Sequence, residues 1–275
     1  MPPRTYRPSD VALSVTKAVG RASARHATVR RGIGRITSSV RSRPQTIRRG
    51  PAKGLRINVA GSRLGYVLGT SETHTQDFMA HHLPSGAVFY DLGANIGFLS
   101  LVASALVGLE GAVYAFEPWP ANAAAARVNA EMNRLAQMRI IEVAIGDSVR
   151  MAAFARGRSD QDGHLVGEGE DGLAVRVLSV DAFLALPDSR PPALIKIDIE
   201  GQELAAIRGM RQTIRDHRPI FLVEMHDAAP SLETHPIAVA LREASYDVRW
   251  LEPINGPVGH WVCHLVGMPS DGFRP

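Results

Sequence analysis

The sequence predicts an α/β fold built on a mostly parallel sheet with helices on both faces. Short, mostly apolar runs with the length of buried strands, such as 112–116 and 194–199, alternate with longer stretches of helical spacing. Strands that alternate with helices form parallel sheets, which are buried on both faces and therefore apolar throughout. At 275 residues, 45% of them hydrophobic, the chain suits one such domain with an appendage.

The elements follow one another regularly from residue 54 onward. A strand beginning at Val88 leads through a tight turn into a helix, because two glycines four apart separate its apolar run from an apolar helical pattern. The helix that follows the next strand begins at Pro120, where a missing backbone N–H costs nothing. The glycine-rich section 151–172 predicts a hairpin or a mobile loop. We further predict strands over 64–68, 112–116, 139–143, 175–180, 194–199 and 220–224, helices over 75–82, 120–133, 202–210 and 236–244, and a terminal edge hairpin of strands 246–251 and 261–266.

Basic residues are concentrated at the start of the chain. Residues 1–50 hold twelve basic side chains and one acid, a formal charge of +11, whereas the remaining 225 residues carry −7. Four interpretations remain open: a solvated, disordered or partly helical extension, a patch that contacts nucleic acid or an anionic membrane, an organellar transit segment, and a misassigned start codon. No aromatic side chain follows Tyr6 in this stretch, which weakens the nucleic-acid interpretation.

Composition also limits compartment and chemistry. No apolar run approaches the roughly 18 residues of a membrane helix. Cys263 is the only cysteine, so an internal disulfide and a cysteine-built metal site are excluded. It stands in an apolar run and is best interpreted as a small buried residue. The lone cysteine and the absence of a secretory apolar core fit a cytoplasmic protein.

The segment VFYDLGANIGF, residues 88–98, carries the first chemical signal. Asp91, Gly93, Asn95 and Gly97 form a strand-to-helix turn of the kind that receives a nucleotide-like or zwitterionic ligand. Asn95 also suits a plain left-handed turn position. Glu117 follows the next strand, 24 residues beyond Gly93, close to the offset of about 20 residues at which an acid meets ribose hydroxyls.

The third glycine of the dinucleotide pattern is missing, because Ser100 stands at its position. A diphosphate needs close backbone approach around the whole turn, and a cofactor without one does not. The motif therefore favours S-adenosylmethionine over NAD. The alternative to a ligand-binding role for Asp91 and Glu117 is that each is a helix cap or a surface acid.

The chain resembles the FkbM family of S-adenosylmethionine-dependent methyltransferases over roughly residues 65–225. The resemblance implies a Rossmann-like class I methyltransferase fold, in which a seven-stranded, mostly parallel sheet has one antiparallel edge strand. It also implies methyl transfer, usually to a hydroxyl of a natural product or sugar. The matching segments are GYVLGTSE (65–72), VFYDLGANIGFLSL (88–101), VYAFEPWPAN (113–122), VAIGD (143–147), VRVLSVDAFL (175–184), LIKIDIEGQE (194–203) and IFLVEMH (220–226).

The same resemblance assigns roles to individual residues. Asp91, Gly93, Asn95 and Gly97 would hold the methionine half of the cofactor, and Glu117 would bind the ribose. Asp147 would meet the adenine amino group, although an ordinary turn acid explains it equally well. The chain then divides into the extension 1–50 and a methyltransferase domain 51–275, with a cap (51–86) and a catalytic core (87–275).

Acidic side chains gather where two further strands end. A hydroxyl is a poor nucleophile near neutral pH, so transfer needs a group that removes its proton. We expect no metal; a divalent cation held by the same side chains is the less favoured alternative. Glu203 is a weaker candidate base, since it also suits a helix N-terminus. The four candidate catalytic residues are Asp198, Glu200, Glu224 and His226, of which His226 also suits a solvent-facing loop.

The sequence thus favours O-methylation of a hydroxyl on a small molecule with S-adenosylmethionine as cofactor. A nucleotide-dependent oxidoreductase on a similar sheet is one alternative. The other is a nucleic-acid-binding protein that acts through its basic extension.

Overall fold

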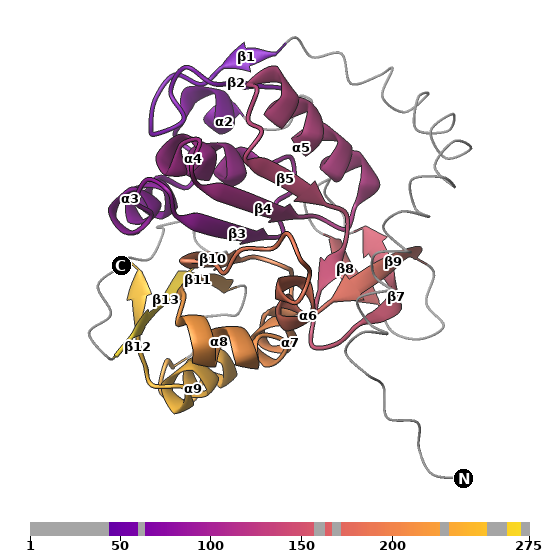
Figure 1. Ribbon diagram of the computed structural model, residues 1–275, viewed down its shortest axis with the longest axis vertical. Helices are drawn as coiled ribbons and strands as arrows, with labels where there is room; N and C mark the ends of the chain where they lie inside the picture. The colour runs from indigo at the N-terminus through magenta and orange to yellow at the C-terminus, as the bar shows by residue number, and fades with distance from the viewer. Residues whose placement is uncertain are drawn as a thin grey trace.

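The computed structural model describes residues 44–59, 64–156, 163–166, 172–225, 231–251 and 263–270. Its centre is a seven-stranded sheet (Figure 1). The strands are β3 (Val88–Leu92), β4 (Ala112–Phe116), β5 (Met138–Ile141), β10 (Leu194–Ile197), β11 (Ile220–Met225), β12 (Tyr246–Leu251) and β13 (Cys263–Pro269).

The strand order is β12-β13-β11-β10-β3-β4-β5. Neighbours from β11 to β5 are parallel, whereas β13 runs antiparallel to both β11 and β12. The sequence-based fold class is confirmed, and the antiparallel part of the sheet is the hairpin predicted at one edge. Strands β3, β4 and β10 are buried along their whole length, as their mostly apolar sequences predict, and the charged exceptions are Asp91 of β3 and Lys196 of β10.

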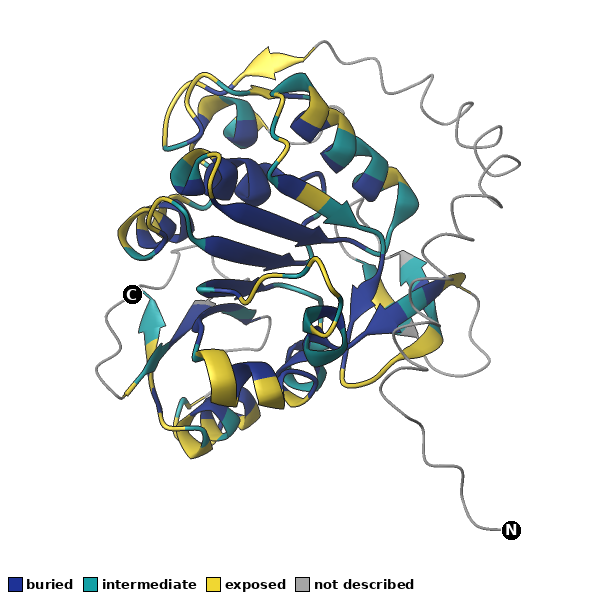
Figure 2. Cartoon of the chain, viewed as in Figure 1, coloured by how far each residue is buried: buried dark blue, intermediate teal, exposed yellow. Residues whose placement is uncertain are grey.

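Helices cover both faces of the sheet, as Figures 1 and 2 show. Side chains alternate between the faces along each strand, so that Phe89 and Tyr90 belong to different buried clusters. Phe89 lies on the face covered by α3 (Thr73–His82), α4 (Phe98–Val107) and α5 (Pro120–Met132). Tyr90 lies on the face covered by α6 (Val180–Leu184), α7 (Glu203–Arg208), α8 (Arg211–His217) and α9 (Pro236–Glu243).

Two smaller sheets flank the main one. Strands β1 (Gln45–Thr46) and β2 (Arg56–Ile57) pair antiparallel. The second small sheet has the order β6-β9-β7-β8, and its strands β7 and β8 form an antiparallel hairpin, which confirms the hairpin predicted within 151–172. Its strands are β6 (Ala144–Ile145), β7 (Arg150–Arg156), β8 (Gly163–Val166) and β9 (Leu173–Leu178).

The strand predicted over 64–68 is wrong, because this segment forms the short helix α2 (Leu64–Leu68). A five-residue apolar run has too few turns for its periodicity to separate helix from strand. Tertiary packing decides the conformation here: the buried Tyr66 ring stacks on Phe98 at the start of α4, with ring centroids 4.5 Å apart.

Residues 44–59 dock on the main domain rather than extending from it. Ile47 is buried, and the side-chain oxygens of Asn129 on α5 and of Asn133, the C-cap residue of α5, accept the backbone N–H groups of Asn58 and Arg56 at 2.7 Å. Packed chain thus begins before residue 51, where the sequence-based division starts its domain. Residues 1–43 lie outside the described part, so the interpretations of the basic extension stay predictions. None of the helices in the described ranges is long and apolar enough to cross a membrane.

Candidate active site

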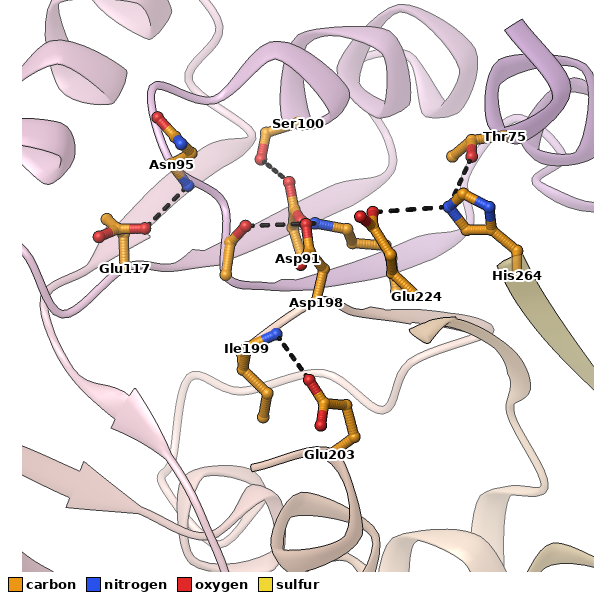
Figure 3. A network of polar contacts seen from close by, with 12 residues as sticks. Thr75, Asp91, Asn95, Ser100, Glu117, Asp198, Ile199, Glu203, Glu224 and His264 are labelled. Carbon is orange, nitrogen blue, oxygen red and sulfur yellow. Dashed lines mark hydrogen bonds and ion pairs between the residues drawn. The ribbon is translucent and has the colours of Figure 1, made fainter. Parts of the chain in front are cut away.

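One face of the sheet carries a row of ionisable side chains at the edge where its parallel strands end. Asp91 of β3 is in register with Lys196 of β10, and Glu224 of β11 is in register with His264 of β13. Lys196 is also in register with Leu222, two residues before Glu224. Because residues in register, and residues two apart, share a face, all four ionisable side chains project towards α3 and α4. Figure 3 shows three of them, Asp91, Glu224 and His264, converging there.

The turn after β3 depends on left-handed backbone conformations. Gly93 has φ 84°, and a Cβ on it would lie 1.8 Å from the carbonyl oxygen of Asp198, so only glycine fits. Asn95 has φ 51°, which agrees with the turn interpretation of this residue, and its side-chain oxygen accepts the Ile96 N–H at 2.7 Å. Gly97, also at φ 84°, precedes α4. The turn therefore packs directly against the loop that follows β10.

Asp91 is held from two sides inside the protein. It is 1% exposed, and its carboxylate accepts a hydrogen bond from the Ser100 hydroxyl at 2.6 Å. The other carboxylate oxygen lies 3.5 Å from Lys196 Nζ. Ser100, which occupies the place of the third glycine of the dinucleotide pattern, thus orients an acid instead of admitting a phosphate.

Lys196 is almost fully buried and has acidic neighbours. Its ammonium lies 3.1 Å from the Asp198 carboxylate and donates to the carbonyl oxygen of Gly93 at 3.2 Å. Burial lowers the pKa of Lys196, but Asp198 and Asp91, with Glu72 and Glu224, raise it by more, so the pKa lies above its ordinary value. The lysine is therefore charged, and it joins the ends of β3 and β10 electrostatically.

Glu117 connects the loops that follow β3 and β4. One carboxylate oxygen accepts the backbone N–H of Asn95 at 2.8 Å (Figure 3). The other accepts the backbone N–H of Trp119 at 2.9 Å. Burial raises the pKa of Glu117 to about 7, although these two N–H groups favour the ionised form. Asn122 contributes a longer contact of 3.5 Å. The carboxylate is thus fixed at the rim of the turn.

A cavity of about 420 Å³ joins these groups. Asp91, Gly93, Asn95 and Glu117 line one part of it, and an apolar part is formed by residues that include Val143, Ile145 and Phe154. The other lining residues with carboxylate, ammonium or imidazole groups are Glu72, Lys196, Asp198, Glu200, Glu224 and His264.

Two sequence-predicted cofactor residues lie away from the cavity lining. Gly97 packs against α5 and β5, where a Cβ would lie 3.2 Å from the Ala126 Cβ and 3.0 Å from the Met138 methyl group. Asp147 is exposed and accepts a hydrogen bond from the Ser148 hydroxyl at 2.8 Å. Its contact with an adenine amino group stays a prediction.

The acidic segment after β10 divides into lining and supporting residues. Asp198 and Glu200 line the cavity, and Glu200 has φ 51°. The buried Glu203 carboxylate instead accepts the N–H of Ile199 at 3.4 Å (Figure 3). It also accepts the N–H of Gly201 at 3.0 Å. Glu203 therefore closes the turn at the start of α7, which is the helix N-terminal role considered for it.

A second ionisable group lies on the far side of Lys196. His264 Nε2 is 3.6 Å from Glu224 Oε2 and 3.3 Å from the Thr75 hydroxyl (Figure 3). Glu72, at the start of α3 with φ 53°, completes the group. Burial raises the pKa of Glu72 to about 7, against the lowering effect of Lys196.

The sequence analysis did not identify Glu72 or His264. His264 stands in an apolar run and reaches Glu224 through the antiparallel register, which the sequence does not encode locally. The only available signal for Glu72 was that it ends the segment GTSE, one of the matched stretches. His226 lies outside the described residues, so its catalytic role stays a prediction.

Comparison with known proteins places this chain in a family. The family model of the methyltransferase FkbM domain matches residues 91–248, more than half of the chain. No curated protein matches it. A solved FkbM methyltransferase from Methylobacillus flagellatus is 16% identical, with a TM-score of 0.45; the match covers 80% of this chain but only 48% of that one.

Two further solved structures match this chain with similar sequence identities and TM-scores. A SAM-dependent O-methyltransferase from Thermotoga maritima is 15% identical, with coverage of 74% and 67% and a TM-score of 0.44. Fibrillarin from Aeropyrum pernix, solved with bound S-adenosylmethionine, is 13% identical, with 68% of each chain covered and a TM-score of 0.45. Identities and TM-scores of this size say nothing about activity. The family model, together with the sheet order, confirms the resemblance carried by the motifs: the chain belongs to the FkbM family of S-adenosylmethionine-dependent methyltransferases.

Proposed function

We propose that this protein binds S-adenosylmethionine in the cavity and transfers its methyl group to a hydroxyl of a small molecule. The observation that carries the proposal is the charge of the cavity. Among the described residues that line the cavity, Asp91, Asp198, Glu72 and Glu224 surround one ammonium, that of Lys196. S-adenosylmethionine, with a sulfonium, an ammonium and one carboxylate, brings net positive charge to this excess of acid. NAD brings a negatively charged diphosphate, which the same carboxylates repel.

The positions of the polar groups suggest how the cofactor lies. The methionine part would occupy the turn beside Asp91 and Gly93, and the ribose hydroxyls would donate to Glu117. The apolar part of the cavity around Val143 and Ile145 would receive the adenine. This orientation points the sulfonium methyl towards Asp198 and Glu224, which line the remaining part.

Methyl transfer makes few chemical demands on the protein. The acceptor oxygen attacks the methyl carbon in line as the C–S bond breaks, which leaves S-adenosylhomocysteine, and the hydroxyl proton must leave. Asp198 and Glu224 are the lining carboxylates that would receive this proton or align the hydroxyl. A volume of about 420 Å³ is typical of small-molecule sites rather than of macromolecular grooves.

Isothermal titration calorimetry of the full chain tests the cofactor assignment. We expect one S-adenosylmethionine per chain with micromolar affinity and no measurable heat from NAD. Incubation with labelled S-adenosylmethionine and a panel of sugars, phenols and polyketide alcohols, with amines as comparison, should then label hydroxyl acceptors. Binding of NAD but not of S-adenosylmethionine would contradict the proposal, and labelling of amines alone would contradict its O-methylation part.

The pKa of Glu117 predicts a pH-dependent cofactor affinity. Ribose hydroxyls donate to the ionised carboxylate, whose pKa of about 7 leaves most molecules protonated at pH 6 and ionised at pH 8. Affinity should therefore rise with pH and be about tenfold higher at pH 8 than at pH 6. Calorimetry across this range checks it. Glu117→Gln should bind more weakly with a flat profile, and an unchanged slope in this variant would assign the titration to another group.

A further inference from the structure

We propose that Glu72, Glu224 and His264 form a binding site for a divalent transition-metal cation beside the cofactor cavity. One ligand atom from each residue can be chosen so that all three lie within 4.8 Å of one another. Two donors on opposite sides of an ion with bonds of about 2.1 Å lie roughly 4 Å apart, so small side-chain rotations would bring the three together. All three residues line the cavity, which gives a cation access and leaves room for further ligands.

Buried polar atoms of the group formed by Glu72, Glu224 and His264 lack hydrogen-bond partners among the described residues. Glu72 Oε2 is buried and has no hydrogen-bond partner among the described residues. A buried carboxylate oxygen without a donor is costly, and a cation removes that cost. Lys196 does not supply it, because its ammonium is already 3.1 Å from Asp198 and 3.5 Å from Asp91.

The position of the His264 side chain is fixed by the fold. Its side chain is 1% exposed, and the antiparallel register of β11 and β13 fixes it directly opposite Glu224. The Nε2 atom faces Glu224 and the Thr75 hydroxyl at 3.6 and 3.3 Å. A ring whose one nitrogen is directed at a carboxylate can offer that nitrogen to an ion between them.

The donor set indicates the class of ion. Carboxylate oxygens alone suit Mg²⁺ and Ca²⁺, whereas an imidazole nitrogen shifts preference towards Mn²⁺, Fe²⁺ or Zn²⁺. The set differs from the one that the sequence suggested for a less favoured metal, since it shares only Glu224 with Asp198, Glu200, Glu224 and His226. The proposal thus departs from the sequence-based expectation that no metal is bound.

The cation would serve the acceptor end of the cavity. It would bind the acceptor hydroxyl and lower its pKa, so that the oxygen loses its proton to water and forms the bond to the methyl carbon while the C–S bond breaks. This role rests on the proposed function. The binding site itself does not, because it can be measured without cofactor or acceptor.

Mn²⁺ titration of the full chain tests the site. The protein is freed of metal with EDTA and dialysed, and Mn²⁺ binding is followed by electron paramagnetic resonance and calorimetry. We expect one Mn²⁺ per chain, weakened at least tenfold in Glu72→Gln and in His264→Asn. Glu131→Gln and His217→Asn replace exposed residues and should bind like the wild type.

The outcomes separate this inference from the proposed function. His264 is buried, so circular dichroism of each variant is needed, and Glu72→Gln alone carries the test if His264→Asn does not fold. Stoichiometric Mn²⁺ binding to the cofactor-free protein that Glu72→Gln weakens at least tenfold, with the fold retained, supports the site. Absence of stoichiometric binding, or binding that keeps the wild-type affinity in Glu72→Gln, overturns it. Equal competition by Ca²⁺ overturns the assignment to a transition metal. These metal-binding measurements do not depend on methyl transfer, so a failure to detect transfer would not change their outcome.

Discussion

Asp91→Asn is expected to lower the affinity for S-adenosylmethionine at least about 100-fold, or roughly 2.7 kcal/mol. The substitution keeps the shape of the side chain but removes the charge that would face the cationic methionine end. It also leaves buried Lys196 with Asp198 as its remaining close carboxylate, so the fold should lose about 3 kcal/mol. Calorimetry gives the affinity, and denaturant unfolding gives the stability.

Two further variants make the result specific. Ser100→Ala removes only the hydroxyl that donates to Asp91, and we expect a loss of less than tenfold. Asp247→Asn changes an exposed acid on β12 and should change neither quantity. If Asp91→Asn bound the cofactor normally while remaining folded, the placement of the methionine end would be wrong.

Glu224→Gln is expected to keep cofactor binding and to slow methyl transfer about 100-fold. Glu224 lines the cavity beside His264, beyond the turn that would hold the cofactor. The affinity for S-adenosylmethionine should therefore stay within about threefold of the wild type. Transfer is measured as label incorporated into the acceptor that the wild-type protein methylates, and binding is measured by calorimetry on the same samples.

The control and the metal dependence sharpen this prediction. Glu233→Gln replaces an exposed acid and should turn over normally. If Glu224 acts as a cation ligand, raising the Mn²⁺ concentration should restore part of the lost rate; if it acts as the base, Mn²⁺ should not help. Normal turnover by Glu224→Gln with bound cofactor would remove it from the catalytic group.

The turn proposed to hold the cofactor was predictable because its signals are local. Asp91, Gly93 and Asn95 lie on one turn whose backbone conformations their residue types favour, and Glu117 follows the next strand. Carboxyl ends of neighbouring parallel strands meet at one sheet edge, so their proximity followed from the alternation of strands and helices. The proximity of the acidic residues at the carboxyl ends of β10 and β11 could be predicted for the same reason.

Other features could not be predicted from local pattern. The segment 64–68 is a helix because Tyr66 packs on Phe98, and the pattern of a five-residue run cannot predict this contact. Glu203 resembled a further candidate base, but its carboxylate holds the turn at Gly201. Asp147 follows a strand, as the other acids do. That strand, β6, belongs to the four-stranded sheet rather than to the main one, and the Asp147 side chain is exposed.

The sequence by itself determined the sheet, the family and the turn proposed to hold the cofactor, because strand length, glycine position and motif order are properties of neighbouring residues. Only the tertiary structure decided which side chains face that turn across the cavity. His264 reaches Glu224 through an antiparallel register, and Glu72 reaches both because α3 folds over the sheet. Contacts of this kind join segments up to about 190 residues apart, as Thr75 and His264 show, and the free energy that selects them belongs to the packed core rather than to any local stretch.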